Sequence, residues 1–299
     1  MKSRVLKLGF IGTGTIGSAL ALTLHSRGYP VVAVSSRYHA SARKLAQAIN
    51  GCSAVTDNQE VADTAEFVFI TTPDDVIAPV ASQTKWRQGQ YVVHCSGADT
   101  TDILEPARKA GTYVGVFHPL QTFAGAREAL ENMPGSTFTL EAEEPLLGIL
   151  QDMANALGGH WIELKAGDKA AYHAAAVIAC NYLVTLVKMA TDLWQTFGIS
   201  REKATRALLP LIRGTVHNIE TIGIPRCLTG PIARGDSGTI KKHLEALEKV
   251  SPDMLTTYKE LGLRTIPIAL AKGRINEQQA EELKTILEPA NCKIAGRSL

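Results

Sequence analysis

The stretch Gly9–Gly17 reads GFIGTGTIG and closes an apolar, β-branched run, Val5–Ile11. A run of this kind that ends in glycines predicts a strand followed by a tight turn. The Ala- and Leu-rich segment Ile16–Ser26 then predicts a helix that stops near Gly28. The pattern G-x-G-x-x-G therefore stands at a strand-to-helix turn, which is the setting in which it binds a dinucleotide.

The three glycines of this turn are expected to have different roles. Gly12 permits the tight turn, Gly14 lets the backbone approach a pyrophosphate, and Gly17 lets the helix pack closely on the strand. The helix N-terminus adds free N–H groups and the positive end of its dipole. The cofactor-binding residues predicted for the turn are Gly12, Thr13, Gly14, Thr15, Ile16 and Gly17.

The end of the second predicted strand, Val31–Ser35, indicates which dinucleotide is bound. A site for NAD places Asp or Glu there to accept hydrogen bonds from the ribose 2′-hydroxyl. The sequence instead continues Ser35-Ser36-Arg37, without a carboxylate. Arg37 can pair with a 2′-phosphate, and Ser36 and His39 can assist it, so the segment predicts NADP rather than NAD. The alternative is a solvated loop arginine.

Further short apolar runs alternate with helical segments as far as residue 165. The expected strands are Phe67–Thr71, Tyr91–Cys95, Thr112–His118, Phe138–Leu140 and Trp161–Leu164. Strands alternating with helices predict a parallel sheet with crossover helices, an α/β Rossmann fold that is doubly wound and mostly parallel. The ends of these strands should face one crevice, because ligands of open α/β sheets bind at the carboxyl edge.

The residues at these strand ends complete the predicted crevice. Thr72, Pro73, Ser96 and Gly97 are predicted to bind the cofactor, and Ser96 and His118 to contact substrate. For His118, the alternative is a histidine hydrogen-bonded near a strand end.

After Asp168 the sequence reads as helices only. One long helix is predicted over Lys169–Phe197, and another from Ser200 to about Ile219, kinked or broken at Pro210. We therefore expect a Rossmann domain over residues 1–165 and an all-helical domain for substrate binding and dimerisation over residues 166–299.

Composition excludes several classes of protein. With 299 residues, 45% hydrophobic, 20% charged and a net charge of +2, the chain fits a soluble two-domain protein without the basic tract of a nucleic-acid binder. Five widely spaced cysteines without C-x-x-C indicate neither a metal site nor a disulfide framework, and favour the cytoplasm. The uncharged segment Ala170–Val187 is rich in alanine and holds polar residues, which favours a buried or subunit-interface helix over a membrane span.

Three motifs carry a family resemblance. They are FHPLQTF (117–123), YHAAAVIACNYLVTL (172–186) and LTGPIARGD (228–236). A Rossmann half followed by a long helix that begins with K-x-x-x-H resembles the 6-phosphogluconate dehydrogenase-like superfamily, which includes β-hydroxyacid dehydrogenases, ketopantoate reductase and pyrroline-5-carboxylate reductase. The three motifs together are similar to a bacterial family with a Rossmann-like N-terminal domain and a C-terminal domain of unknown function.

The resemblance implies catalytic roles for the first helix of the C-terminal half. In the superfamily the helix lysine is a general acid/base or orients substrate, and Lys169 matches it. The asparagine that follows four residues later is replaced here by His173, which leaves the detailed mechanism open. Residues four apart share a helix face, so both side chains are predicted to point into one cleft. Asn181 is the third predicted catalytic residue, with a purely structural hydrogen-bonding role as the alternative.

Arg234 is a further predicted substrate contact. It precedes Asp236, a good N-cap for the next helix, and can clamp a substrate carboxylate. The alternative is a rigid interhelix turn with a surface arginine.

Together these features predict a cytoplasmic, homodimeric, NADP(H)-dependent oxidoreductase. It would reduce a small keto or imino acid, with hydride from the nicotinamide and a proton from Lys169 or His173. Ketopantoate reductase and a prephenate-type dehydrogenase are alternatives within the enzyme class. A redox or metabolite sensor that binds NADP(H) without turnover is the alternative from another class, and a sensor needs no acid in the site.

Overall fold

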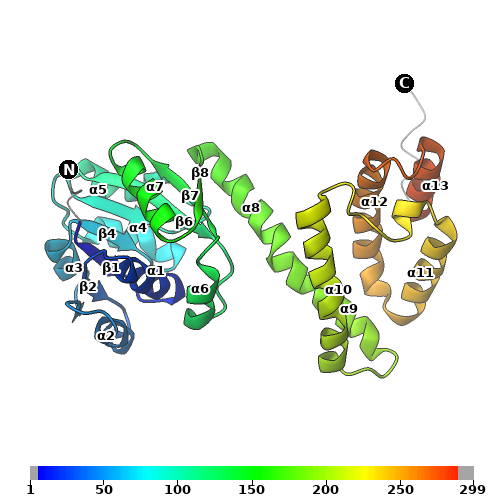
Figure 1. Cartoon of the computed structure of the whole chain (residues 1–299), viewed down its shortest axis with the longest axis horizontal. Helices are drawn as coiled ribbons and strands as arrows, with labels where there is room; N and C mark the ends of the chain where they lie inside the picture. Colours follow the sequence, from blue (N-terminus) through cyan, green and yellow to red (C-terminus); the bar gives the residue numbers. More distant parts are fainter. Residues whose placement is uncertain (1–5, 289–299) are drawn as a thin grey trace. The chain divides into compact units, whose positions relative to one another are not determined.

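The computed structural model describes residues 6–288 (Figure 1). The chain divides into two compact units, one ending at Asn181 and the other beginning at Tyr182. The last strand ends at Glu163, and only helices and loops follow it within the described residues. The domain boundary predicted from the sequence after residue 165 stays a prediction.

The first unit is built on one eight-stranded sheet. Its strands are β1 (Leu8–Ile11), β2 (Val31–Ser35), β3 (Ser53–Val55), β4 (Phe67–Ile70), β5 (Tyr91–His94), β6 (Tyr113–Leu120), β7 (Thr137–Ala142) and β8 (His160–Glu163). Their order is β3-β2-β1-β4-β5-β6-β7-β8. Every neighbouring pair is parallel except β6–β7. The predicted mostly parallel, doubly wound α/β fold is confirmed, and β3 is an additional strand.

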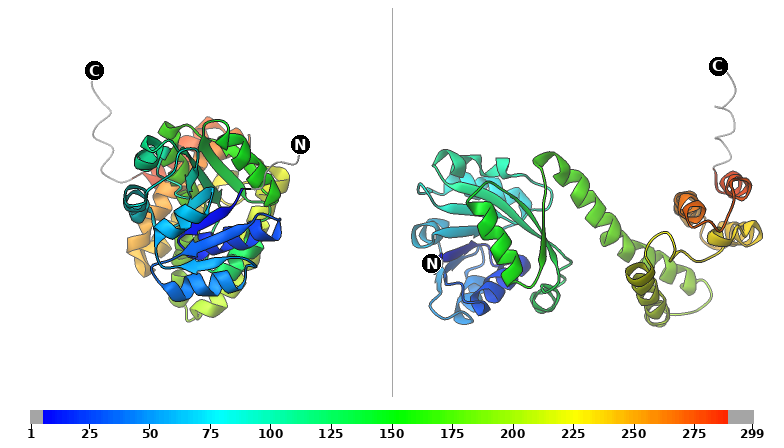
Figure 2. Two further views of the ribbon diagram at one scale, coloured as in Figure 1. Left: turned by 90° about the vertical axis from the view of Figure 1, so that its left-hand side faces the viewer. Right: turned by 45° about the horizontal axis from the view of Figure 1, so that its top comes forward.

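Helices cover both faces of this sheet (Figure 2). They are α1 (Thr15–Ser26), α2 (His39–Gln47), α3 (Asn58–Thr64), α4 (Asp74–Gln83), α5 (Glu105–Lys109), α6 (Ala126–Asn132) and α7 (Leu146–Ala156), with a short 3-10 helix, η1, at Thr101–Leu104. Successive strand residues point to opposite faces, so Phe10 enters the core under α1 and α7 while Ile11 enters the core under α3 and α4. This double burial explains the nearly continuous apolar strands of the sequence.

The direction of winding changes between β1 and β4. The chain runs outward from β1 through β2 to β3, and then returns to pair β4 with the other side of β1. The helices that follow β1 and β4 therefore pack on opposite faces of the sheet, α1 in one core and α4 in the other, and a crevice is expected between them at the carboxyl edge.

The helix predicted over Lys169–Phe197 is two helices, and that prediction was wrong in this respect. After the 3-10 helix η2 (Ala166–Asp168), α8 (Lys169–Ala179) ends at Cys180, whose φ of −110° and ψ of −65° deviate from the ideal helical values, and α9 (Asn181–Gln195) follows. The interruption coincides with the division between the two units.

The next helix, α10 (Arg201–Ile222), continues through Pro210 instead of breaking there. Proline removes the hydrogen bond to the carbonyl of Arg206. Both residues are exposed, so water can satisfy that carbonyl.

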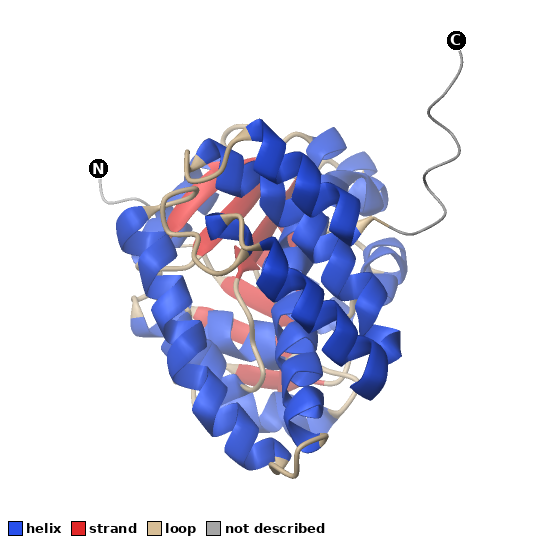
Figure 3. Cartoon of the chain, turned by 90° about the vertical axis from the view of Figure 1, so that its right-hand side faces the viewer, coloured by secondary structure: helices blue, strands red, loops and turns tan. Residues whose placement is uncertain are grey.

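Within residues 182–288 the second unit consists of helices joined by loops (Figure 3, helices in blue and loops in tan). Besides α9 and α10 it contains η3 (Ile232–Arg234), α11 (Ser237–Val250), η4 (Pro252–Met254), α12 (Leu255–Ala271) and α13 (Glu277–Leu287). Asp236 and Asn276 cap α11 and α13 through their side chains, as the sequence indicates for these positions. A separate core, which includes Ile240, Ile266 and Leu283, holds α11, α12 and α13 together.

Candidate active site

The glycine turn after β1 is held tightly against the loop after β4. Gly12 has a φ of +106°, and a Cβ there would lie 2.7 Å from the Thr71 carbonyl, so only glycine fits. A Cβ on Gly17 would clash with the Gly12 carbonyl oxygen and the Thr71 hydroxyl. The Thr71 hydroxyl donates a hydrogen bond of 2.6 Å to that same Gly12 oxygen. The turn is therefore fixed in place, as the roles predicted for Gly12 and Gly17 require.

The space in front of the turn fits a bound pyrophosphate. A Cβ on Gly14 would meet nothing within 4 Å, so the backbone there is open to a ligand. Gly14 caps α1 without a side-chain hydrogen bond, and the first turn holds no acidic residue. The hydroxyls of Thr13 and Thr72 are buried and have no hydrogen-bond partner among the described residues. A diphosphate needs hydrogen-bond donors and room to approach them. The free N–H groups at the start of α1 and the two unpaired hydroxyls are such donors, and the open backbone at Gly14 gives the room.

The three residues at the end of β2 that are predicted to bind the ribose and its 2′-phosphate have different environments. The Ser35 side chain is buried and donates a 2.7 Å hydrogen bond to Asn58, so it supports the loop instead of facing a ligand. Ser36 is half-buried, whereas Arg37 is exposed, with its guanidinium 4.9 Å from the ring centroid of Tyr38. Arg37 has no ion-pair partner within residues 6–288, and Nδ1 of His39 is buried without a hydrogen-bond partner there. A 2′-phosphate would supply a partner for both.

A cavity of about 850 Å³ brings several of the predicted site residues of the first unit together. Its lining comes from the glycine turn (14–16), the loop after β4 (71–74), the end of β6 with the loop after it (parts of 118–123), and α8 up to the start of α9 (parts of 172–181). The crevice at the carboxyl edge is thus closed on one side by α8. Cavities of this size hold small ligands and cofactors.

Two histidines and a tyrosine of the cavity lining contact one another. The ring of His118 lies edge-on to the rings of Tyr172 and His173, at centroid distances of 5.7 and 6.4 Å. Both histidines also pack on Gly97: a Cβ there would lie 2.8 Å from Nε2 of His118 and 2.9 Å from Cδ2 of His173. Glycine at 97 is therefore what lets the two rings converge. His173 makes no hydrogen bond to any part of the chain that the structure describes, so its ring nitrogens are free for a ligand.

Lys169 does not share the position of His173, although the two lie one turn apart on α8. Its side chain is 1% exposed and donates a 3.2 Å hydrogen bond to the Ser96 carbonyl, and Nζ lies 3.9 Å from Oε2 of Glu141. Burial lowers the pKa of Lys169 to about 8, against the opposing effect of Glu141 and Asp99. The ammonium therefore holds the residue that precedes Gly97, behind the wall on which the two histidines pack.

The loop after β5 is fastened by a second buried group, His94. Its Nδ1 accepts from the backbone N–H of Ser96 at 3.1 Å, and its Nε2 contacts the Thr100 carbonyl at 3.1 Å. The Ser96 hydroxyl in turn donates to Asp99 at 2.8 Å. Ser96 is 3% exposed, so its hydroxyl serves the loop. Burial, with the nearby charge of Lys169, lowers the pKa of His94 to about 4.

We expect this buried histidine to make folding pH-dependent. The unfolded chain binds a proton on His94 near pH 6.5, whereas the folded chain binds it only near pH 4. The contribution of His94 to the free energy of unfolding is therefore fully present above pH 6.5. It is lost as the pH falls toward 4, which lowers the free energy of unfolding by about 3 kcal/mol. Denaturant unfolding from pH 7 to pH 4.5 should show a shallower fall in His94→Asn than in the wild type. Equal slopes in the two proteins would contradict the assignment.

The structure thus sorts the predicted site residues into groups. Those that line the cavity are Gly14, Thr15, Ile16, Thr72, Pro73, His118, His173 and Asn181. Those that shape or support its walls are Gly12, Thr13, Gly17, Ser35, Ser96, Gly97 and Lys169. Ser36 and Arg37 lie at the end of β2. Arg234 lies in the second unit, 65% exposed and 4.0 Å from Asp236, and its contact with substrate stays a prediction.

Three residues of the site were not predicted. Tyr172 directly precedes His173 in the motif YHAAAVIACNYLVTL, and this position next to a predicted catalytic residue could have indicated it. Thr139 and Glu141 come from β7, opposite His118 and Val116 of β6 in the antiparallel pairing. The sequence carries no signal for these two, because the register of two strands about twenty residues apart decides which residues face one another.

The helical segment Ala166–Gln195 is long and apolar enough to cross a membrane, with a mean hydropathy of 1.6 over 18 residues. Length and composition alone are weak evidence for a span. Here Tyr172 accepts a hydrogen bond from Thr139, and Lys169 binds the Ser96 carbonyl. These two bonds fasten the first turn of the segment to the Rossmann domain, and the location of the protein outside the membrane stays a prediction.

Two family models match separate parts of the chain. Residues 1–119 match a Rossmann-like domain. Residues 136–265 match a domain of unknown function (DUF2520). The chain joins a Rossmann-like domain to a DUF2520 domain. This pairing confirms the family resemblance carried by the three sequence motifs.

Several solved structures resemble this chain over most of its length. A protein from Thermotoga maritima is 28% identical with a TM-score of 0.73, covering 89% of this chain and 100% of that one. A candidate NADP oxidoreductase from Bacteroides fragilis is 25% identical with a TM-score of 0.70, covering 88% and 98%. Pyrroline carboxylate reductase from Plasmodium falciparum, solved with NADP bound, shares the fold at 18% identity and a TM-score of 0.58, covering 95% and 98%.

One curated relative is an enzyme of named activity. The 2-(hydroxymethyl)glutarate dehydrogenase of Eubacterium barkeri is 25% identical over 186 residues, which make up 59% of this chain. The match spans 60% of the dehydrogenase's own length.

Proposed function

We propose that this protein is an NADP(H)-dependent oxidoreductase that reduces a small keto or imino acid. The observation that carries the proposal is the cavity itself, in which the start of α1 and the imidazoles of His118 and His173 line the same space. A dinucleotide on the glycine turn would reach from Gly14 toward the two histidines. The oxidoreductase names of the relatives from Eubacterium barkeri and Bacteroides fragilis support this reading.

NADP is the proposed form of the cofactor. The end of β2 presents Arg37 and Ser36 and no carboxylate, which suits a 2′-phosphate and not a bare ribose. Two similar structures support this choice, because one is described as an NADP oxidoreductase and the other was solved with NADP bound.

Arg37→Ala should weaken NADPH binding about 10- to 100-fold and leave NADH binding unchanged. The guanidinium would lose its charge-assisted pairing with the 2′-phosphate, which NADH lacks. Arg27→Ala is the matched control, because it removes the same charge at the C-terminal end of α1, away from the glycine turn. Fluorescence titrations with both nucleotides measure the effect. Equal losses for NADPH and NADH, or no loss for NADPH, would contradict the assignment.

The proposed chemistry divides the roles among the side chains of the cavity. The nicotinamide, when bound, supplies hydride to the substrate carbon. His173 lines the cavity with both ring nitrogens unengaged, so we assign it the proton donated to the substrate oxygen or nitrogen. Lys169 is too deeply buried to reach the cavity directly and acts by holding the Ser96 carbonyl, and with it the wall at Gly97.

NADPH consumption with a panel of 2-keto acids and cyclic imino acids tests the proposal. We expect turnover with at least one compound, a severe loss in His173→Ala, and a loss in Lys169→Ala through a disturbed wall. Activity unaffected by both substitutions would overturn the site. Tight NADPH binding without turnover on the whole panel would instead establish the sensor.

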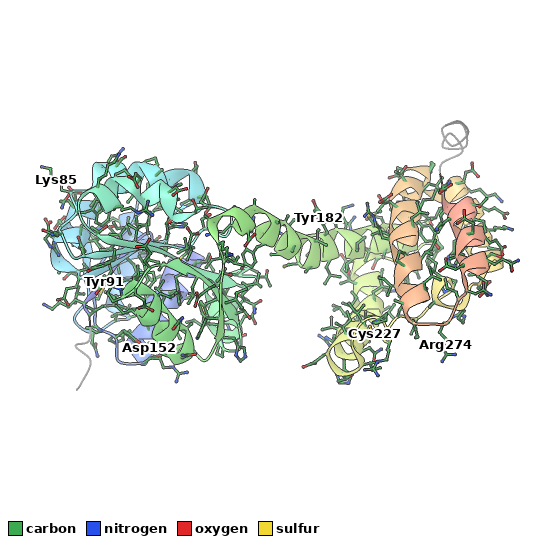
Figure 4. All side chains as sticks on the ribbon, turned by 90° about the horizontal axis from the view of Figure 1, so that it is seen from above. Lys85, Tyr91, Asp152, Tyr182, Cys227 and Arg274 are labelled. Atoms are coloured by element: carbon green, nitrogen blue, oxygen red, sulfur yellow. The ribbon has the colours of Figure 1, made fainter. Side chains whose placement is uncertain are left out.

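The oligomeric state belongs to the same proposal: we propose a homodimer that forms through α8 and α9. Ile178 and Val184 are 63% and 69% exposed. Tyr182, which Figure 4 labels, lies between them in the sequence and is 56% exposed. No part of the apolar 18-residue window in this segment is buried within the chain. A second copy of the same chain is the commonest partner for such a surface. A cytoplasmic location is proposed alongside it.

Val184→Glu should convert the dimer to a monomer. A buried unpaired carboxylate at the centre of an apolar interface is strongly destabilising. Light scattering should give twice the chain mass of 32.1 kDa for the wild type and for Gln47→Glu, a control on the exposed face of α2, and the single mass for Val184→Glu. A monomeric wild type would refute the homodimer.

A further inference from the structure

The environment of His118 differs from that of His173 in one respect: one of its ring nitrogens is occupied. Nδ1 of His118 lies 2.9 Å from the Tyr172 hydroxyl, and the Thr139 hydroxyl donates to that same phenol oxygen at 2.6 Å. Three elements meet here, since His118 and Thr139 are opposite each other on β6 and β7 and Tyr172 comes from α8. None of the roles assigned above uses this chain of bonds.

The bond that Thr139 donates to Tyr172 favours one position for the proton of the His118 imidazole. Thr139 donates to the phenol oxygen, so the single proton of Tyr172 is free to be donated to Nδ1 of His118. An imidazole that accepts at Nδ1 carries its proton on Nε2 when it is neutral. Nε2 has no hydrogen-bond partner within the described chain and lies beside Gly97, where no side chain blocks it.

We propose that His118 is a neutral hydrogen-bond donor whose Nε2–H is held for a substrate oxygen by Tyr172 and Thr139. This inference rests on the proposed reductase function and names a substrate class for it. A donor that carries no charge binds an atom with a lone pair, and a carbonyl oxygen offers two. An iminium nitrogen carries its own proton and has no lone pair, so the arrangement favours keto over protonated imino substrates.

The surroundings of the ring keep it uncharged at neutral pH. The titratable groups that act on His118 are Lys169 and His173 on α8 and His94 on β5, and Tyr172 is bonded to it directly. Burial first, and then Lys169, lower the pKa of His118 to about 4. Burial also raises the pKa of Tyr172, so its proton stays available for donation. His118 is thus a fixed donor, which leaves proton transfer to His173.

Nitrogen NMR of the cofactor-free protein tests the assignment independently of turnover. Eight histidines are present, and the spectrum of His118→Gln identifies the signals of residue 118. We expect a protonated, pyrrole-type Nε2 and an unprotonated Nδ1 at neutral pH. A proton on Nδ1, or a charged ring, would overturn the proposal. Absence of turnover on any substrate would remove the reductase function and leave this result standing.

Tyr172→Phe supplies the second readout, because it removes the donor and keeps the ring. The pKa of His118 should rise by about one, since the neutral form loses a hydrogen bond, and kcat/KM for keto acids should fall about tenfold. Thr139→Val should shift the pKa in the same direction by less. Tyr258→Phe is the matched control, because it breaks the 2.7 Å bond to Nδ1 of His243 in the second unit. A lowered or unchanged pKa in Tyr172→Phe would show that Nδ1 donates, and would overturn the proposal.

Discussion

Gly14→Leu is expected to reduce the affinity for NADPH at least about 100-fold, a loss of about 3 kcal/mol, in a protein that still folds. Gly14 has a φ of −70°, which any residue adopts, and a Cβ there meets nothing within 4 Å. The leucine would therefore occupy the open cradle at the start of α1 without disturbing the core. The effect arises because the side chain excludes the pyrophosphate from the N–H groups of the helix.

A matched control separates exclusion from destabilisation. Gly148→Leu places the same side chain on α7, where a Cβ approaches only the Glu144 carboxylate, at 3.4 Å. We expect this variant to bind NADPH normally and both variants to unfold at similar temperatures. Calorimetric titration gives the dissociation constants and thermal unfolding gives the stability. Normal NADPH binding by a folded Gly14→Leu protein would show that the dinucleotide does not use this turn.

His173→Gln should lower kcat by about 10²- to 10⁴-fold, the range that removal of a general acid produces. Glutamine retains polarity and approximate size but cannot deliver a proton at neutral pH. The NADPH dissociation constant should stay unchanged, because His173 comes from α8 and does not belong to the glycine turn that is expected to hold the pyrophosphate. Steady-state kinetics with the substrate found in the panel, together with NADPH titration, make this measurement.

His160→Gln provides the corresponding control. His160 is exposed at the start of β8 and does not line the cavity, so kcat should remain at the wild-type value. If His173→Gln were as active as His160→Gln, the proton would have to come from another group. A fall in NADPH affinity with unchanged kcat would make His173 a binding residue instead.

Much of the first unit was predictable because its signals are local. Apolar runs such as Val31–Ser35 and Phe67–Thr71 coincide with strands to within one residue, since burial on both faces requires continuous apolar sequence. The glycine turn was recognisable because a positive φ at Gly12 and a close approach at Gly17 admit no other residue. The strand β3 was not predicted, because Ser-Ala-Val is too short and too exposed to form a recognisable apolar run.

The burial of Lys169 could not be predicted from the sequence pattern around it. Helical periodicity correctly places Lys169 and His173 near one face of α8, but it does not say what covers the first turn. The loop after β5 and Glu141 of β7 do so, and both are distant in sequence. The lysine was therefore predicted to face the cleft and is instead enclosed behind its wall. The Thr139–Tyr172–His118 chain was invisible for the same reason, because it depends on the β6–β7 register.

A crystal structure of the protein with NADP⁺ bound tests the central claim most directly. We predict that the pyrophosphate lies on the backbone N–H groups of residues 14–16, with the 2′-phosphate on Arg37. The nicotinamide C4 should lie within about 4 Å of the space between His118 and His173, as hydride transfer requires. A dinucleotide bound away from the glycine turn, or a nicotinamide that points out of the cavity and away from both histidines, would contradict the account.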